Sequence, residues 1–153
     1  MRQYKLSILV ALYKAGNFVQ SKLQSIINQT IFDDCQLVIL NCLNLDNERN
    51  IYEKYISLPN VSVIEYNEYK YLYDTWNDGI NITNSEYITN ANVDDQWHPE
   101  FAEQCTNYLD NRHDISIVST NILVTHIAHQ LWPNWEYHDK FPQYVYPNST
   151  AGP

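Results

Sequence analysis

The 153-residue sequence has only 3 glycines, and its 9 basic residues are outnumbered by 18 acidic ones, which gives a formal net charge of -9. The shortage of glycine excludes collagen-like and most low-complexity chains, and no Gly-rich phosphate loop of the classical dinucleotide-binding type is present. The shortage of basic residues excludes a general nucleic-acid binder, because such a protein needs a basic surface to displace counterions from phosphates. With 44% hydrophobic residues, the chain can still bury a core.

Cysteines and long apolar runs are also scarce. Cys35, Cys42 and Cys105 form no Cys-x-x-Cys pair, and their odd number would leave one unpaired in an oxidising compartment. A reducing, cytoplasmic location is therefore expected. The longest apolar run, residues 6–12, is too short to span a bilayer, and no small-residue cleavage site follows it. This run predicts a buried strand rather than a transmembrane segment or a signal peptide.

Short apolar runs alternate with longer amphipathic segments, which is typical of β-α units around a mainly parallel sheet. The apolar runs predict strands over residues 6–12, 36–40, 61–65, 87–90 and 115–119. The amphipathic segments predict helices over residues 18–28, 48–56 and 71–84 and a further helix from Pro99. Asn17 is the expected cap of the first helix. Leu72, Trp76 and Ile80 are expected on the core face of the third, and Tyr108 on the inner face of the last.

The pattern weakens after residue 120, where prolines and aromatic residues become frequent. Residues 121–129 could hold one more strand, and the rest of the tail is loop-like. Such a tail rarely folds alone, so it is expected to pack on the core or to dock on a segment absent from this chain. No internal repeat or linker divides the sequence.

In open α/β sheets, ligands bind outside the carboxyl ends of the strands. Residues 92–95, Asn-Val-Asp-Asp, form the most informative of these strand ends. Two adjacent carboxylates repel each other unless a cation or hydrogen-bond donors offset the repulsion. A hard divalent ion held by Asp94 and Asp95 would do so and would leave positions for water and diphosphate oxygens. The alternative is a solvated acidic loop that caps the helix near Pro99.

Five motifs in order resemble the donor-binding half of a family 2 glycosyltransferase. They are a strand that ends at Tyr13, a Ser-x-x-x-Gln-Thr helix end at residues 25–30, a strand that ends at residues 41–44, a helix with Asn77 and Gly79, and residues 85–88 followed by Asn92-Val93-Asp94-Asp95 and Pro99. The resemblance spans residues 7–120. Any one of these motifs would be weak evidence, whereas five in the right order and spacing are specific.

The resemblance implies a single α/β domain of the GT-A fold, with a Rossmann-like, mainly parallel sheet flanked by helices on both faces. Residues 1–120 would form the nucleotide-sugar-binding domain, and residues 121–153 would begin a truncated or missing acceptor-binding region. Tyr13 would stack on the base, and Asp94 would coordinate Mn or Mg between the phosphates, with Asp95 as a second candidate ligand. The nucleotide-sugar site implied by the resemblance comprises Ala11, Leu12, Tyr13, Asn41, Cys42, Asn77, Gly79, Asn92, Val93 and Asp94.

Several positions depart from the family pattern. Asn41 and Cys42 stand where the family holds the base with a pair of aspartates, which leaves the identity of the base open. Asn92 replaces the first aspartate of the metal motif, so weaker metal binding is expected. Trp76 replaces an arginine, and its spacing favours a place in the core over contact with a ligand.

The function implied by the resemblance is transfer of a sugar from a nucleotide diphosphate, a UDP-sugar in the first place, to an acceptor hydroxyl, with inversion at the anomeric carbon. Such a reaction needs a general base. In the tail, Glu136, His138 and Asp139 lie in no segment that resembles the family's base motif, so no catalytic residue is assigned.

Two alternatives stay open at this point. The chain could be a truncated, non-catalytic module of the same fold that binds a nucleotide, or binds a partner protein or a second copy through its aromatic tail. It could also be a receiver-like or flavodoxin-like sheet in which Asp94 and Asp95 form an acidic pocket.

Overall fold

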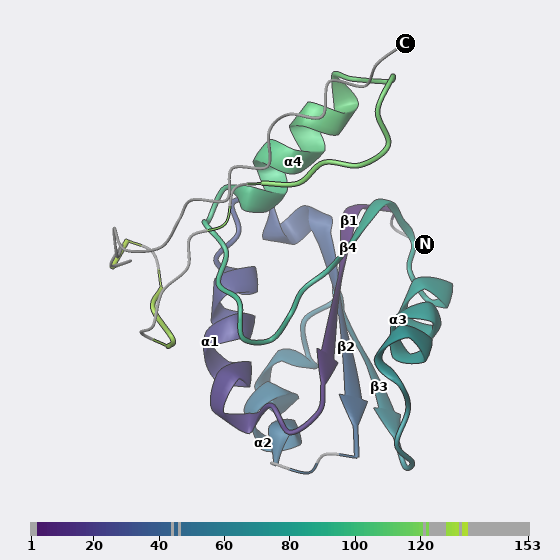
Figure 1. The fold of residues 1–153 in the computed structure, drawn as a ribbon, viewed down its shortest axis with the longest axis vertical. Helices are drawn as coiled ribbons and strands as arrows, with labels where there is room; N and C mark the ends of the chain where they lie inside the picture. The colour runs from purple at the N-terminus through teal and green to yellow at the C-terminus, as the bar shows by residue number, and fades with distance from the viewer. Residues whose placement is uncertain are drawn as a thin grey trace.

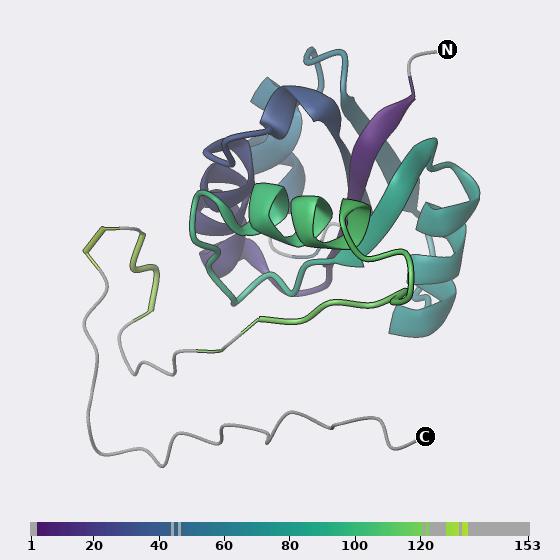
Figure 2. The ribbon, with the colours of Figure 1, turned by 90° about the horizontal axis from the view of Figure 1, so that it is seen from above.

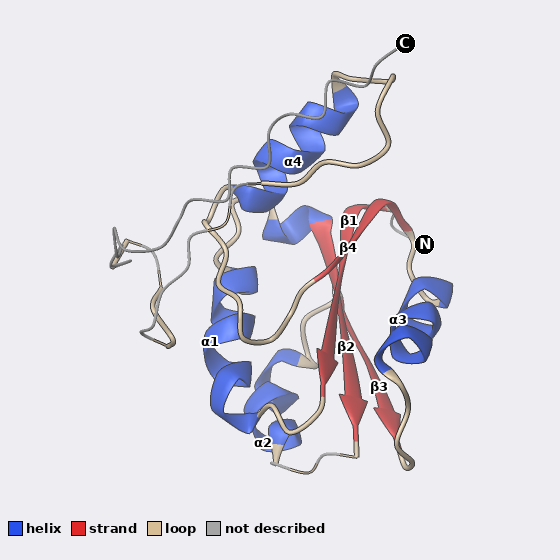
Figure 3. Ribbon diagram, viewed as in Figure 1, coloured by secondary structure: helices blue, strands red, loops and turns tan. Residues whose placement is uncertain are grey.

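The centre of the fold is a sheet of four parallel strands. The computed structural model describes residues 3–43, 45, 47–120, 122, 128–131, 133 and 134. The strands are β1 (Tyr4–Leu12), β2 (Cys35–Cys42), β3 (Val61–Tyr66) and β4 (Ser85–Asn90), in the order β3-β2-β1-β4. Every neighbouring pair is parallel, and Figure 3 shows the arrowheads of β1, β2 and β3 at the same edge. The predicted parallel α/β sheet is confirmed.

Helices cover both faces of this sheet. The helices α1 (Gly16–Ile27), α2 (Glu48–Tyr52) and α4 (Phe101–Asp110) contribute to one layer, and α3 (Leu72–Asn81) lies against the opposite face (Figure 1). Short 3-10 turns, η1 (Phe32–Asp34) and η2 (Glu53–Tyr55), precede β2 and follow α2. Figure 2 shows α1 and α3 on opposite sides of the strands, as a doubly covered sheet requires.

The two central strands explain the apolar sequences of residues 6–12 and 35–40. β1 and β2 are flanked by strands on both edges and covered on both faces, so nearly all of their side chains are buried. Successive residues alternate between two hydrophobic layers. Ile8 and Val10 face the larger layer, with α1, α2 and α4, whereas Leu9 and Leu40 face the smaller layer beneath α3.

Two small residues bring α3 close to the sheet, and Trp76 is half-buried beside them. Thr75 and Gly79 are buried there, whereas Leu72 and Ile80 are 47% and 45% exposed, so the prediction that they line the core is wrong. A Cβ at Gly79 would lie 3.0 Å from Leu40 Cδ1 and 3.2 Å from a methyl group of Leu9. The missing side chain therefore lets the helix backbone approach the sheet closely.

Gly79→Val is expected to destabilise the fold by about 1–3 kcal/mol, because the added methyl groups would push α3 away from the sheet. Valine has the better helix propensity, so propensity alone predicts a small gain in stability. Urea unfolding of the variant and of the wild type would measure the difference. Asn77→Val, at an exposed position of the same helix, is the matched control and should change stability by less than about 0.5 kcal/mol. Equal stability of Gly79→Val and wild type would contradict this packing account.

Three local predictions are wrong. Residues 115–119 form no strand: within the described part of the chain they pair with nothing in the sheet, and Ile117 is 86% exposed. A short apolar run does not by itself distinguish a strand from an extended loop. Asn17 does not cap α1, which begins at Gly16; the Ala15 N–H instead donates to the buried Glu48 carboxylate at 3.1 Å. Tyr108, expected on the inner face of α4, is exposed.

Most of the predicted tail lies outside the described residues, including most of the strand suggested at 121–129 and most of the aromatic surface suggested for self-association. Among the helices that the structure does describe, none combines the length and apolar character needed to cross a bilayer.

Candidate functional site

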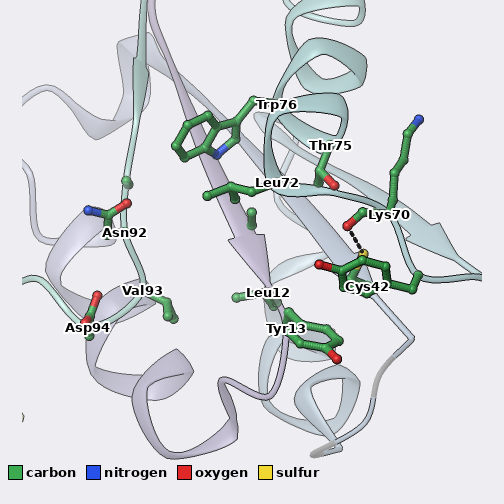
Figure 4. A pocket seen from close by; sticks show the side chains of 13 residues that line it. Leu12, Tyr13, Cys42, Lys70, Leu72, Thr75, Trp76, Asn92, Val93 and Asp94 are labelled. Carbon is green, nitrogen blue, oxygen red and sulfur yellow. Dashed lines mark hydrogen bonds between the residues drawn. The ribbon is translucent and has the colours of Figure 1, made fainter.

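A hollow of about 280 Å³ opens at the carboxyl ends of β1, β2 and β4. Figure 4 shows its side chains, which come from the ends of β1 and β2, from α3, and from the loops before α3 and after β4. The residues that line it are Ala11, Leu12, Tyr13, Cys42, Tyr69, Lys70, Leu72, Thr75, Trp76, Ala91, Asn92, Val93 and Asp94. The three strand ends singled out in the sequence therefore meet at one place.

Strand register explains why these segments converge. Leu12 pairs with Asn41 on β2, while Leu9 pairs with Asn90 on β4 and accepts a hydrogen bond from the Ala91 N–H at 2.8 Å. The carboxyl ends of parallel neighbours lie at one edge of the sheet, so the segments that follow β1, β2 and β4 must leave from the same edge. Beyond Tyr13 the chain turns through Lys14, whose φ is +52°, into α1.

One wall of the hollow is aromatic. The Tyr13 side chain is 45% exposed, and its ring contacts Tyr69 edge-on, with 5.2 Å between ring centroids. Tyr69 in turn contacts Tyr71 with centroids 5.4 Å apart. Exposed aromatic faces of this kind can stack on a nucleotide base or a sugar. Tyr69 was missed by sequence reasoning, and the signal that could have found it is the density of tyrosines in residues 66–73.

Asn41 and Cys42, which were expected to act together, lie on opposite faces of the sheet. Cys42 lines the hollow, and its thiol donates to the Lys70 carbonyl oxygen at 3.6 Å, the dashed line in Figure 4. Asn41 is 1% exposed and points toward α2, where its amide donates to the Tyr52 hydroxyl at 2.9 Å. Tyr52 donates to Glu65, and burial together with this carboxylate raises the pKa of Tyr52 to about 12. Asn41 therefore belongs to a buried structural network outside the hollow.

The residues of α3 that were considered for the site also differ in where they lie. Gly79 is buried against the sheet, and Asn77 is exposed on the helix, so both lie outside the lining of the hollow. Trp76, interpreted as core, has both roles: it is half-buried against Leu9 and Leu40 and also forms a wall of the hollow (Figure 4). The indole thus adds to the aromatic surface that a bound ligand would meet.

The acidic turn that follows β4 forms the opposite wall. Asn92 and Asp94 line the hollow, whereas Asp95 is exposed outside it and accepts a hydrogen bond from the Asn92 amide at 3.2 Å. In the described residues no group of three His, Cys, Asp or Glu side chains gathers to hold a metal ion. The oxygens of Asp94 and Asn92 suit Mn²⁺ or Mg²⁺, and magnesium sites often use one or two carboxylates together with substrate phosphates. These donors fit a cation shared with a diphosphate, but not one caged by the protein alone.

A lysine lies buried beneath this turn. Lys22, on α1, is fully buried, and its ammonium nitrogen lies 4.1 Å from the centroid of the Trp97 ring. Burial lowers the pKa of Lys22 to about 8, and the negative charges of Asp95 and Asp94 oppose this drop. Sequence reasoning missed Lys22. The signal is its place on the apolar face of α1, three residues after Val19 and four before Ile26.

The strand order and the helices on both faces define a Rossmann-like α/β domain of the GT-A type. The profile of the family described as Glycosyl transferase family 2 matches residues 7–146, and the chain belongs to this family. The match excludes the receiver-like and flavodoxin-like alternatives.

Individual relatives agree with this assignment. The chain is 29% identical over 111 residues to EpsH of Bacillus subtilis (strain 168), which is named as a glycosyltransferase, a match that covers 72% of this chain and 32% of EpsH. Residues 1–349 of TarS from S. aureus superpose with a TM-score of 0.67 at 20% identity, over 71% of this chain and 33% of that one. The mannosyltransferase PcManGT from Pyrobaculum calidifontis gives 0.64 at 15% identity, over 71% and 33%. The chain thus spans about a third of the length of these relatives.

Proposed function

We propose that the chain binds a nucleotide-diphosphate sugar in the hollow at the carboxyl ends of β1, β2 and β4, as the donor-binding part of a glycosyltransferase. The observation that carries the proposal is the pairing of two walls: an aromatic wall with Tyr13, and an acidic wall with Asn92 and Asp94. A nucleotide has an aromatic base at one end and a diphosphate further along, and the two walls match these two parts.

In this account the chain's own residues bind and orient the donor. Tyr13 stacks on the base, the backbone near Ala11 faces the base or ribose, and Trp76 excludes water from the middle of the hollow. Asp94, with Asn92, would hold Mn²⁺ or Mg²⁺. The chemistry that such a cation supplies is stabilisation of negative charge on the departing diphosphate. An acceptor hydroxyl then attacks the anomeric carbon from the opposite side, so the configuration inverts, and a general base takes the hydroxyl proton.

A UDP-sugar is the first donor to test. Two neighbours of similar fold support a nucleotide sugar in general: TarS structures are described in complex with UDP and with UDP-GlcNAc, and PcManGT in complex with GDP-Man and Mn²⁺. In this chain, Cys42 occupies the part of the hollow next to Tyr13, and its thiol is a poor reader of a base edge. Selectivity between uracil and guanine is therefore expected to be weak.

Thermal unfolding with UDP or GDP, each with Mn²⁺ or with EDTA, tests the proposal. A ligand that binds only the folded state stabilises it by about 2.7 kcal/mol at a hundred times its dissociation constant. The melting temperature should therefore rise by several degrees, and more with Mn²⁺ than with EDTA. UMP, which lacks the second phosphate, is the matched control and should gain little from Mn²⁺. No shift with either nucleoside diphosphate would overturn the proposal.

A second candidate is a binding module of the same fold that does not turn over its ligand. It is favoured by Asn92 and Cys42 in the hollow, which stand where the family pattern has aspartates. Slow hydrolysis of UDP-GlcNAc by the isolated chain, measured by release of UDP, separates the two candidates. Thermal stabilisation without any UDP release, even with added saccharide acceptors, would favour the binding module.

A further inference from the structure

The side chain of Lys22 is an unusual feature of the domain interior. It is fully buried on α1, and its ammonium group has no hydrogen-bond partner in the described part of the chain. Its Nζ atom lies over the Trp97 ring, 4.1 Å from the ring centroid. A buried ammonium with no partner is costly, and an apolar side chain of similar length would avoid that cost. A contribution to the stability of the fold therefore does not explain the charge of Lys22.

The groups that face Lys22 come from the turn and loop after β4. Asp94 and Asp95 interact with it electrostatically, and the turn is tied to α1 by a hydrogen bond of 2.9 Å from the Trp97 N–H to the Ser25 hydroxyl. Gln96, next to Trp97, has a buried side-chain oxygen that also lacks a partner in the described residues. The segment that follows β4 is therefore hydrogen-bonded to the part of α1 that carries the buried Lys22.

Two other lysines lie near the hollow and have other neighbours. The ammonium nitrogen of Lys14 lies 5.4 Å from the centroid of the Tyr13 ring. Lys70 lines the hollow, but its ammonium group forms an ion pair with Asp78 and lies above the Tyr66 ring. Figure 4 shows this ammonium group pointing away from Asp94. Lys22, by contrast, interacts electrostatically with both Asp94 and Asp95.

We propose that Lys22 is a positioning residue that supplies positive charge to the acidic turn from within the protein, so that a diphosphate binds beside Asp94 with less need for a divalent cation. The inference rests on the proposed function of the hollow. Two carboxylates repel an approaching diphosphate, and one buried ammonium beneath them offsets half of their charge. A buried charge acts through the protein interior, where water and salt screen it less than at the surface.

The proposal predicts opposite effects on two binding reactions. Lys22 attracts the diphosphate, so its loss should weaken UDP binding in EDTA. Lys22 repels Mn²⁺, so its loss should strengthen cation binding beside Asp94 and restore UDP binding when Mn²⁺ is present. A lysine that only supported the fold would instead shift both UDP affinities by the same factor.

The test is calorimetric titration of UDP at pH 7 into the wild type and Lys22→Met, once with EDTA and once with saturating Mn²⁺. The quantity to compare is the ratio of the two dissociation constants, EDTA over Mn²⁺, which should be about tenfold larger in Lys22→Met. Lys54→Met, which removes an exposed lysine and gives the same net charge, is the matched control and should keep the wild-type ratio.

An unchanged or smaller ratio in Lys22→Met, with UDP still bound, overturns the role of Lys22 and leaves the proposed function in place. Failure of the wild type to bind UDP under both conditions overturns the proposed function, and the role of Lys22 with it. Lys22→Gln provides a second neutral side chain in case the methionine variant does not fold. Because charge and not shape is responsible, both variants should give the same ratio.

Discussion

Replacing Asp94 with asparagine is expected to abolish the part of UDP binding that depends on Mn²⁺. Asp94 is the carboxylate that lines the hollow, and an uncharged amide binds hard divalent cations far more weakly than a carboxylate does. The dissociation constants with Mn²⁺ and with EDTA should become equal in calorimetric titrations. At saturating Mn²⁺ and UDP, up to about 2.7 kcal/mol of ligand-linked stabilisation would be lost.

Asp95→Asn is the matched control for this variant, since it removes the neighbouring carboxylate by the same replacement of one oxygen with an NH2 group. Asp95 is exposed outside the lining and accepts a hydrogen bond from Asn92, so its loss should leave most of the Mn²⁺ effect. Both variants should unfold within about 0.5 kcal/mol of the wild type without ligand, because both side chains are exposed. A larger loss of the Mn²⁺ effect in Asp95→Asn than in Asp94→Asn would show that Asp95 binds the cation, and would contradict the role proposed for Asp94.

Lys22→Met is expected to stabilise the unliganded domain by up to about 3 kcal/mol at pH 7. Burial lowers the pKa of Lys22 from 10.5 to about 8, so at neutral pH the folded chain carries a charge that favours the unfolded state. Methionine fills a similar volume without the charge and can keep the contact with the Trp97 ring. Urea unfolding of both proteins at pH 7 measures the gain.

The pH dependence of this gain identifies its cause. Between about pH 8 and 10.5 the unfolded chain keeps the Lys22 proton while the folded chain releases it, so the wild type gains stability as pH rises. The advantage of Lys22→Met should therefore be full below pH 8 and disappear near pH 10.5. Asp94 and Asp95, which interact with Lys22, and the tyrosines are common to both proteins, so the difference between the two proteins reports on Lys22. A gain that does not vary with pH, or a variant less stable than the wild type at pH 7, would contradict the account.

The sequence predicted the sheet because the burial of its central strands on both faces is visible in short runs of apolar residues. The runs at residues 6–12 and 36–40 are mostly apolar on both faces, as is typical of strands that are covered on both faces. The run at 115–119 is similar in composition but pairs with no strand in the described chain, because pairing depends on a neighbouring edge that composition does not specify. The position of helix α3 in the chain was predicted correctly, but the side of the helix that faces the sheet was not. That side is determined by the close approach of Gly79 to the sheet, which the spacing of apolar residues does not indicate.

The sequence predicted which strand ends meet at the candidate site better than it predicted which side chains point into it. Cys42 is the last residue of β2, and Tyr13 and Asp94 follow β1 and β4, so topology alone brings the three to one edge of the sheet. Asn41 was included because it stands, with Cys42, where the family pattern has a pair of aspartates. Alternation along β2 sends its side chain to the other face of the sheet. Tyr69 and Lys22 are 47 residues apart in the sequence, and neither belongs to a strand end. Their places near the hollow follow from how α1 and the loop before α3 pack, which needs the structure.

A crystal of the chain soaked with UDP and MnCl₂, with data collected at the manganese absorption edge, tests the central claim most directly. The account predicts one anomalous peak within coordination distance of an Asp94 oxygen and of the diphosphate, with the uracil ring against Tyr13. Manganese or diphosphate bound elsewhere on the molecule, with the hollow between Tyr13 and Asp94 empty, would contradict it.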